Sequence, residues 1–266
     1  MIRACIFDLG GTIVDRYSLT PFLSFKKIFE NKGIYVSNEL LSKDMGKDKR
    51  EHIRNIMNSF IVTNQWFNKY NDYPDELDIN KLMDNFNEIQ IDYSDKIIDI
   101  LPETKECIDN LQFNSIKTGC TTGFNKENME IIQNKLIRNN IYLNSYVSST
   151  CLNKPTRPHP HMIYKNMDNL DIKNPLSVIK VDDTITGIHE GVNAKCWTVG
   201  VARWSVNMNI TSIEDAYYLD EGLHSNEINE RLKTSRKILR DAGADYVIDT
   251  LNELPILIDK INNKLI

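Results

Sequence analysis

The chain has 266 residues, which is enough for one large domain or two modest domains with a real hydrophobic core. Apolar residues make up 41% of the chain and charged residues 26%, as in ordinary soluble globular proteins. The formal net charge of -5 argues against a general nucleic-acid binder, and no apolar run approaches the ~20 residues of a membrane span. We therefore expect no nucleic-acid partner and no membrane partner.

The cysteines and the start of the chain indicate a compartment. The first predicted strand begins within a few residues of Met1, which leaves no room for a signal peptide. The cysteines are odd in number and lack the spacing of a zinc or redox motif, so they fit reduced thiols better than a disulfide framework. We expect a cytoplasmic protein. The cysteines are Cys5, Cys107, Cys120, Cys151 and Cys196.

The first predicted element is a buried strand, the apolar run Ala4–Phe7, which ends at the carboxylate of Asp8. Gly10 and Gly11 follow, so the backbone can turn sharply there and come close to a ligand. In an open α/β sheet, ligands lie beyond the carboxyl ends of the strands. Asp8 is therefore placed as a nucleophile or a metal ligand, unless it is an incidental residue before a Gly-rich turn.

Residues 17–98 have the length and periodicity of a small helical domain rather than a loop. Apolar residues recur there at helical spacing, Gly33 is placed to end the first helix, and Ser37 is placed to cap the second. We predict an all-helical cap domain over 17–98, inserted into an α/β core domain formed by 1–16 and 99–266.

Beyond the insertion, predicted strands and helices alternate along the chain. Such alternation implies parallel pairing, so the predicted fold class is α/β with a doubly wound parallel sheet. The predicted strands cover 115–120, 142–148, 177–181, 196–201 and 244–248. The predicted helices cover 102–113, 125–139, 160–170, 185–194, 210–239 and 251–266.

Polar groups stand at the ends of three predicted strands, at Asp8, Thr122 and Asp183. Because the carboxyl ends of parallel strands share one edge of a sheet, these groups can meet at one ligand. Asp8 with Asp182 or Asp183 would supply the hard oxygen ligands that Mg²⁺ prefers. The segment Thr121–Gly123 would supply neutral donors for phosphate oxygens at a helix start. Each feature alone also fits an ordinary loop or helix cap.

Three prolines make the segment Lys154–Pro160 a stiff loop. Arg157 within it would offer a planar, fixed charge to a phosphate or a phosphonate, although a surface arginine in a Pro-rich linker fits the same pattern. His159 and His161 have no partner ligands for a metal in the sequence, so we interpret them as structural.

The segment Asp8–Thr12 resembles the first motif of the haloacid dehalogenase superfamily, Asp-x-x-Gly-Thr after a strand. In that superfamily the first Asp attacks phosphorus and forms an aspartyl-phosphate, and most phosphatases carry a second Asp two residues later as general acid and base. Here that position is Gly10, so a leaving group that needs a proton would lack its donor. The superfamily also uses Lys or Arg in its third motif, which is the place of Arg157.

A closer resemblance lies in the predicted cap. Met45–Arg54 looks like the Met-Gly-x-x-Lys-x-x-His segment of the phosphonoacetaldehyde hydrolase family, in which the Lys forms a Schiff base with the substrate aldehyde. The match places that role on Lys49, and Gly10 is similar to the small residue of that family's first motif. Read without the family, the same segment is a solvated charge run on a helix. The resemblance continues through Gly119–Gly123, Arg157–Pro158, Lys180–Thr184, Cys196–Gly200 and Ala244–Thr250.

The resemblance implies Mg²⁺-dependent hydrolysis of the C–P bond of phosphonoacetaldehyde. A protonated imine on Lys49 would accept the electron pair of the broken C–P bond while Asp8 attacks phosphorus. It implies that Mg²⁺ is held by Asp8, the Gly10 carbonyl and Asp183. The substrate-binding residues it implies are Thr122, Arg157, His52 and Met45, with His52 on the helix face of Lys49 as a proton relay. We further expect the charges of Lys47 and Arg50 to lower the Lys49 pKa.

Three departures from the family pattern and two alternative functions accompany this interpretation. Gly187 stands where many superfamily members have another Asp, Thr156 where a Gly often precedes the Arg, and Phe124 where a Tyr often follows the Thr-Gly turn. One alternative is a phosphatase acting on a small phosphate ester, which Gly10 disfavours. Another is a non-catalytic phospholigand-binding protein. The family resemblance also implies a homodimer formed through the helical insertion.

Overall fold

The computed structural model describes residues 1–220 and 225–264, whose centre is a six-stranded, wholly parallel β-sheet. The strand order is β3-β2-β1-β4-β5-β6, so the first strand lies in the middle. The predicted α/β class and each predicted strand are confirmed. The strands are β1 (Ala4–Phe7), β2 (Lys117–Thr122), β3 (Ser145–Ser148), β4 (Val178–Asp182), β5 (Trp197–Val201) and β6 (Tyr246–Ile248).

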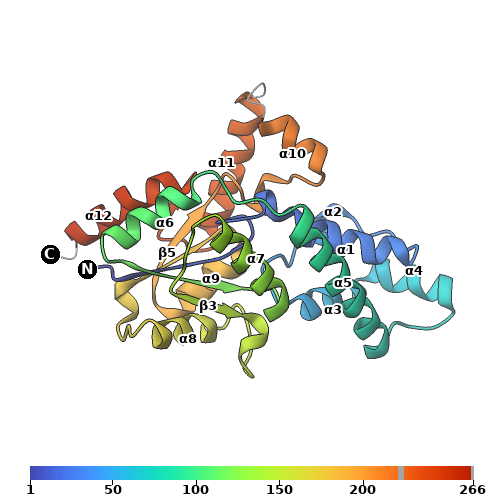
Figure 1. The fold of residues 1–266 in the computed structure, drawn as a ribbon. Coiled ribbons are helices and arrows are strands. Elements are labelled where there is room, and N and C mark those ends of the chain that lie inside the picture. The colour runs from blue at the N-terminus through green and yellow to red at the C-terminus, as the bar shows by residue number, and fades with distance from the viewer. Residues whose placement is uncertain (221–224, 265–266) are drawn as a thin grey trace.

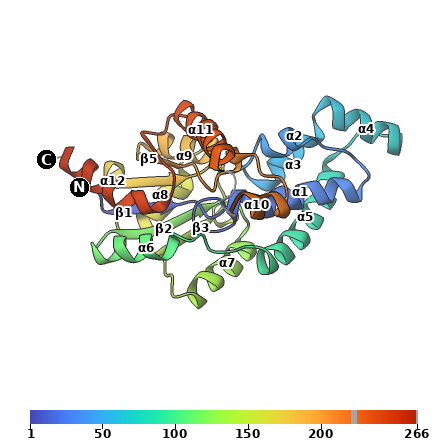
Figure 2. The ribbon, with the colours of Figure 1, turned by 90° about the horizontal axis from the view of Figure 1, so that it is seen from above.

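Helices cover both faces of the sheet, and β1 shows why. Its alternate residues point to opposite faces: Cys5 and Phe7 belong to the hydrophobic cluster shared with α6, α7 and α12, whereas Ala4 and Ile6 belong to a cluster shared with α8. Figure 2 shows α6 and α7 on one side of the sheet and α9 and α11 on the other. These helices are α6 (Thr104–Phe113), α7 (Lys126–Arg138), α8 (His161–Asn169), α9 (Ile185–Ala194), α11 (Ser225–Asp241) and α12 (Leu254–Lys264).

Between β1 and α6 the chain forms five helices that extend away from the sheet (Figure 1). They enclose a hydrophobic cluster of their own, built mainly from residues 22–86. The predicted helix end and helix cap are both present. Gly33 has a positive φ of 61° after the first helix, and the Ser37 side chain accepts from the Leu40 N–H. The five helices are α1 (Leu19–Asn31), α2 (Asn38–Ser42), α3 (Lys49–Met57), α4 (Phe60–Tyr70) and α5 (Glu76–Lys96).

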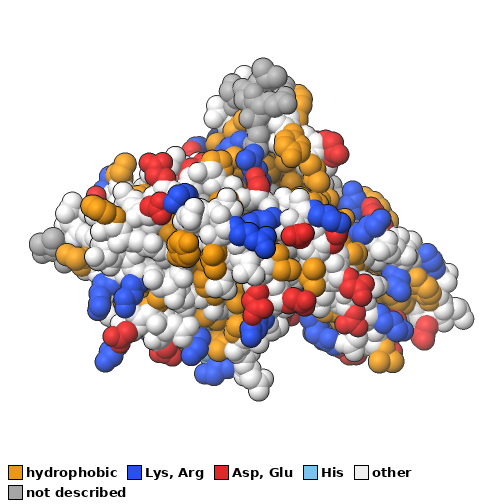
Figure 3. Space-filling view, viewed as in Figure 1, with side chains coloured by type: hydrophobic (Ala, Val, Ile, Leu, Met, Phe, Trp, Pro, Cys, Tyr) orange, Lys and Arg blue, Asp and Glu red, His pale blue; other side chains and the backbone are white. Residues whose placement is uncertain are grey.

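The helical stretch predicted over 210–239 consists of α10 (Ile213–Asp220) and the longer α11, while residues 221–224 lie outside the described part of the chain. The predicted last helix begins with a 3₁₀ turn, Leu251–Glu253, and its final residues 265–266 are also outside the described part. On the face drawn in Figure 3, acidic and basic side chains intermingle, and hydrophobic side chains gather over α10. None of the helices within residues 1–220 and 225–264 combines the length and apolarity that a bilayer span requires.

Candidate active site

The polar groups predicted at the strand ends do meet. Because β1 lies between β2 and β4, Asp8 after β1, Thr122 at the end of β2 and Asp183 after β4 lie at one edge of the sheet. A cavity opens there between the sheet and the helical insertion. Its lining consists of Asp8, Gly10, Ser18, Pro21, Met45, Gly46, Lys49, Thr122, Gly123, Phe124, Arg157 and Thr184.

Two glycines allow the helical insertion to close onto the strand ends. A Cβ on Gly46, whose φ is 89°, would lie 2.6 Å from Oγ1 of Thr184. A Cβ on Gly123 would lie 2.8 Å from the carbonyl oxygen of Lys47. Because neither position leaves room for a side chain, the segment before α3 contacts the loops after β2 and β4 directly, and Lys49 lines the same cavity as Asp8.

Lys49 is the first residue of α3, which Asp48 caps by accepting from two backbone N–H groups. Only 5% of Lys49 is exposed, and its Nζ lies 5.6 Å and 5.4 Å from the ring centroids of Phe25 and Phe124. Burial lowers the pKa of Lys49 to about 8, while the Asp8 carboxylate opposes that shift and the charge of Arg157 adds to it. The amine is therefore readily available in its neutral, nucleophilic form.

The cause predicted for this pKa shift was wrong. Lys47 forms an ion pair with Asp44 at 2.8 Å, and Arg50 forms one with Glu76 at 3.2 Å, so both cations are engaged elsewhere. The lowered pKa of Lys49 comes mainly from burial between aromatic rings. The charge run seen in the sequence is thus a mixed helix face, with Lys49 turned inward and its neighbours outward.

His52 lies one turn after Lys49 but is not part of the cavity lining. It is fully buried, its ring packs 4.1 Å from the ring of Phe25, and neither ring nitrogen forms a hydrogen bond with the described residues. Burial, with the charge of Lys49, lowers the pKa of His52 to about 3. The imidazole is therefore neutral at physiological pH. It does not line the cavity, whereas Lys49 on the same helix does.

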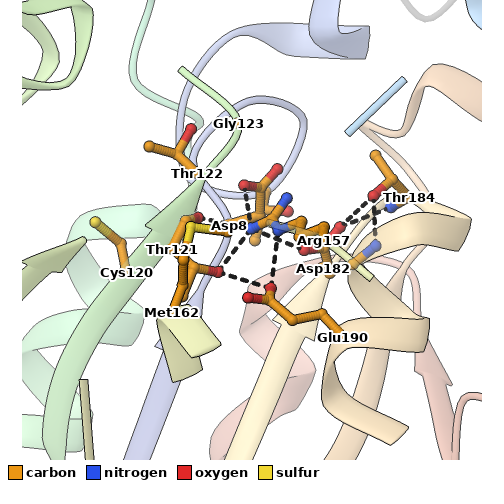
Figure 4. A network of polar contacts seen from close by, with 12 residues as sticks. Asp8, Cys120, Thr121, Thr122, Gly123, Arg157, Met162, Asp182, Thr184 and Glu190 are labelled. Carbon is orange, nitrogen blue, oxygen red and sulfur yellow. Dashed lines mark hydrogen bonds and ion pairs between the residues drawn. The ribbon is translucent and has the colours of Figure 1, made fainter. Parts of the chain in front are cut away.

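Arg157 joins the loop before α8 to the strand ends, as Figure 4 shows. Its Nη2 donates to Asp8 Oδ1 at 2.9 Å and to the carbonyl and hydroxyl oxygens of Thr121 at 2.8 Å and 2.6 Å. Its Nε donates to Glu190 at 2.8 Å, and Lys180 Nζ donates to the same Thr121 hydroxyl at 2.7 Å. The carboxylates around Arg157 raise its pKa further against the opposing effect of burial, so it is a permanent cation.

Three buried carboxylates could hold a metal ion, because oxygen atoms of Asp8, Asp182 and Asp183 lie within 4.8 Å of one another. Asp182 already accepts from the backbone and hydroxyl of Thr184 at 2.9 Å and 2.7 Å and pairs with Lys180 at 2.9 Å. Asp183 has no described cation partner, and burial beside Asp182 and Asp8 raises its pKa strongly. Such a donor set, oxygen-only and with an uncompensated carboxylate, fits Mg²⁺.

Residues 5–201 match the model of a family described as haloacid dehalogenase-like hydrolases. The chain belongs to this family. It is 33% identical over 268 residues to the phosphonoacetaldehyde hydrolase of Bacteroides fragilis, and the alignment covers 99% of this chain and 98% of that relative. It is also 33% identical over 265 residues to a bifunctional phosphonoacetaldehyde hydrolase/aminoethylphosphonate transaminase of Clostridioides difficile, of which it spans only 41%.

A solved structure supports the same assignment. The crystal structure of a phosphonoacetaldehyde hydrolase-like protein from Oleispira antarctica has a TM-score of 0.92 and 32% sequence identity, and covers 99% of this chain and 94% of that chain. This haloacid dehalogenase-like hydrolase therefore shares its fold and its overall length with that protein.

The unusual Gly187 of this haloacid dehalogenase-like hydrolase has a structural reason. A Cβ on Gly187 would lie 1.9 Å from the carboxyl carbon of Asp182. The Asp182 carboxylate thus occupies the space in which a side chain at 187 would begin. At this edge of the sheet the buried carboxylate comes from Asp182 at the end of β4, while position 187 on α9 supplies none.

Sequence reasoning missed some of the residues gathered at the site. Ser18 lines the cavity from the left-handed turn before α1, and its φ of 51° gave no signal in the sequence. Glu190 lies in the interior of α9 and reads in sequence as an ordinary acidic helix residue. His159 and His161 stack on each other with centroids 6.1 Å apart and belong to no metal-ligand cluster among the described residues.

Proposed function

We propose that this hydrolase cleaves the C–P bond of phosphonoacetaldehyde to acetaldehyde and phosphate. The observation that carries the proposal is Lys49, a buried amine with a pKa of about 8 that lines one cavity with Asp8 and Arg157. Hydrolysis of a phosphate ester does not require a reactive amine. It does require a general acid for the leaving group, which the glycine at position 10 cannot supply. The similarity to two relatives named for phosphonoacetaldehyde hydrolysis supports the substrate.

In the proposed reaction, the neutral Lys49 amine adds to the aldehyde carbonyl, and water leaves to give a protonated imine. A carboxylate oxygen of Asp8 attacks phosphorus, the C–P bond breaks, and its electron pair moves into an enamine. The enamine takes a proton on carbon, and hydrolysis of the resulting imine releases acetaldehyde and regenerates Lys49. A second water cleaves the aspartyl-phosphate, so the net reaction consumes one water.

The other predicted residues take supporting parts in this proposal. Arg157 and Thr122 bind the phosphonyl oxygens, and Met45 covers the substrate from the segment before α3. We place His52 behind Lys49 as a neutral group rather than as a cationic proton relay, in keeping with its pKa of about 3. Residues 17–98 act as the cap domain, and segments 1–16 and 99–266 as the core domain.

We also propose that Mg²⁺ is the cofactor, held by Asp8, the carbonyl of Gly10 and Asp183. When bound, the ion would offset the negative charge of the phosphonyl oxygens as phosphorus is attacked. The cluster of buried carboxylates supports this assignment. The protein's own contribution is to hold Asp8 beside Arg157 and to exclude bulk water by covering the strand ends.

We further propose a cytoplasmic homodimer. Each of the chain's cysteines is a free thiol, as expected in a reducing compartment. An apolar surface on the cap supports self-association: Phe60 and Ile61 at the start of α4 are 80% and 66% exposed, and Tyr73 after it is 64% exposed.

The deciding experiment follows phosphate and acetaldehyde release from phosphonoacetaldehyde with Mg²⁺. We expect equal amounts of both products and a loss of at least about a thousandfold in kcat for Lys49→Arg, because a guanidinium cannot form the imine. Lys47→Arg, two residues away and paired with Asp44, is the matched control and should retain activity. Turnover of simple phosphate esters that survives Lys49→Arg, with no release from the aldehyde, would favour a phosphatase instead.

A further inference from the structure

Arg157 is the largest fully buried side chain among the described residues, and its guanidinium is held on two sides. Nη2 is bonded to Asp8 and Thr121, and Nε is bonded to Glu190. Nη1 forms no hydrogen bond with the described residues, although Arg157 lines the cavity. A buried N–H that lacks a partner is costly, so Nη1 is the donor that an oxyanion in the cavity would satisfy.

Glu190 holds Arg157 from the side away from the cavity. It is fully buried on α9, does not belong to the cavity lining, and places Oε2 2.8 Å from Arg157 Nε and 3.5 Å from Lys180 Nζ. The Thr121 hydroxyl, which accepts from both cations, donates to the same oxygen at 3.1 Å. One carboxylate oxygen therefore anchors two cations and a hydroxyl in a fixed arrangement.

The neighbouring glycine makes this arrangement possible. A Cβ on Gly191 would lie 2.9 Å from Cβ of Lys180 and 2.6 Å from a methyl group of Thr198. Because position 191 has no side chain, α9 can approach β4 and β5 closely enough for Glu190 to reach Arg157. A carboxylate is seldom buried unless it is paired, and one of the partners of Glu190, Arg157, lines the cavity.

We propose that Glu190 is a positioning residue, which fixes the Arg157 guanidinium through Nε so that Nη1 faces the phosphonyl group. This inference rests on the proposed function, since it assigns to Arg157 the recognition of a phosphonate or phosphate. Glu190 itself does not touch the substrate. Without its carboxylate, the guanidinium keeps only the contacts of Nη2 with Asp8, Thr121 and Asp182, and it turns away from the oxyanion.

The test compares Glu190→Gln, which keeps the shape of the side chain, with His189→Gln, an exposed control on the same helix. Binding of inorganic phosphate in the presence of Mg²⁺ is measured by calorimetry. Imine formation is measured separately by borohydride trapping of acetaldehyde on Lys49, read by mass spectrometry. We expect Glu190→Gln to bind phosphate at least tenfold more weakly and to trap acetaldehyde as the parent protein does, because acetaldehyde has no phosphonyl group.

A double variant, Lys180→Met with Glu190→Gln, separates anchoring from charge balance. It removes one charge of each sign. We expect phosphate to bind at least tenfold more weakly than to the parent protein, as in Glu190→Gln alone, because Arg157 Nε still faces no carboxylate. Recovery of phosphate binding in the double variant would overturn the anchoring role. So would unchanged phosphate affinity in Glu190→Gln, or a parallel loss of trapping, phosphate binding and thermal stability, which would indicate a purely structural role.

The two proposals fail in different ways. Absence of a trapped adduct in the parent protein would count against imine chemistry on Lys49, while the phosphate measurement would still decide the role of Glu190. Normal trapping together with unchanged phosphate affinity in Glu190→Gln would leave the proposed reaction standing and remove only the anchoring role.

Discussion

At the scale of single residues, the proposed reaction depends on the protonation state of Lys49. Burial lowers the pKa of Lys49 to about 8, and only the neutral amine adds to a carbonyl. We therefore predict that kcat/KM for phosphonoacetaldehyde rises with pH and levels off above about pH 8. The measurement is phosphate release at low substrate concentration from about pH 6 to about pH 9.5.

Replacing an aromatic neighbour checks the cause assigned to that pKa. Phe25→Ala opens the amine to water, so the inflection should move upward toward the ordinary value of 10.5. Lys47→Arg leaves the burial of Lys49 intact and should keep the parent profile. An inflection near 8 that persists in Phe25→Ala would show that burial between aromatic rings is not the cause.

The contact between Gly187 and Asp182 makes a second prediction for single residues. A Cβ at 187 overlaps the Asp182 carboxylate, so Gly187→Ala must displace a member of the metal cluster. We expect Mg²⁺ to bind about tenfold more weakly, measured by calorimetry, because Asp182 adjoins the proposed ligands Asp8 and Asp183 and the loss of an outer-shell partner typically costs that much or more. Val192→Ala, on the exposed side of α9, is the control.

An exchange of the two residues sharpens this test. Asp182→Gly combined with Gly187→Asp returns a carboxylate to the sheet edge from the helix instead of the strand. The pair should bind Mg²⁺ more tightly than Gly187→Ala alone. If Gly187→Ala itself binds Mg²⁺ as the parent does, the packing of this glycine against Asp182 has no bearing on the metal site.

At the scale of elements, the sheet was predictable because most residues of its strands are buried and turn residues separate the strands from the helices. The same logic located Asp8, Thr122 and Asp183, since parallel strands bring their carboxyl ends to one edge. Lys49 was found through the spacing of a family segment rather than through its helix. The first turn of that helix, Lys49–Glu51, is charged throughout, and the local pattern does not reveal which of its side chains turns inward.

Glu190 could not be predicted for a physical reason. It lies 33 positions after Arg157, and nothing in the local sequence of α9 indicates that this acidic residue is buried. Its burial results from the close approach of α9 to the sheet at Gly191, which is a property of packing. Contacts of this kind depend on how elements meet, so sequence periodicity does not contain them.

The segments that join the cap to the core share a buried polar network. Asp15, with a left-handed φ of 57°, accepts from the backbone and hydroxyl of Thr20. Gln90 on α5 donates to the Thr20 hydroxyl and to Ser94, and Ser94 donates to Asn128 on α7. This network connects the start of α1, the end of α5 and the core helix α7, which are the places where a cap would hinge.

The Asp15 carboxyl makes the stability of this region depend on pH. Burial raises its pKa from 3.8 to about 7. Since the folded-state pKa is the higher one, its stabilisation is complete below about pH 4 and is lost as pH rises through about 7. We predict that raising the pH from about 5 to about 8 lowers the free energy of unfolding by roughly 2–3 kcal/mol more in the parent than in Asp15→Asn.

Chemical denaturation at the two pH values measures this difference. Asp92→Asn removes an exposed carboxylate on α5 that pairs with Lys96, and serves as the control with the parent pH dependence. Equal pH dependence in the parent and in Asp15→Asn would mean that Asp15 is ionised in the folded protein at neutral pH.

At the scale of the whole molecule, the proposed dimer surface and the cavity lie on different parts of the cap. Figure 1 shows α4 at the end of the molecule far from the sheet, whereas the start of α3 contributes Lys49 to the cavity beside the sheet. A partner subunit bound to α4 would therefore not contact the strand ends or the cavity beside them. Dimerisation through this surface would hold the cap and leave the core free to move against it.

This arrangement predicts that dimerisation and catalysis can be separated. Phe60→Asp places a charge in the exposed apolar surface of α4, and we expect it to convert a dimer into a monomer because a charge buried at an interface is strongly unfavourable. Light scattering after size exclusion measures the mass, and kcat/KM should stay within about twofold of the parent, since Phe60 lies outside the cavity.

Phe113→Asp, at an 89% exposed residue on α6, is the matched control and should remain dimeric. A parent protein that is monomeric at all concentrations would refute the dimer. Dissociation by Phe113→Asp but not by Phe60→Asp would move the interface from the cap to the core.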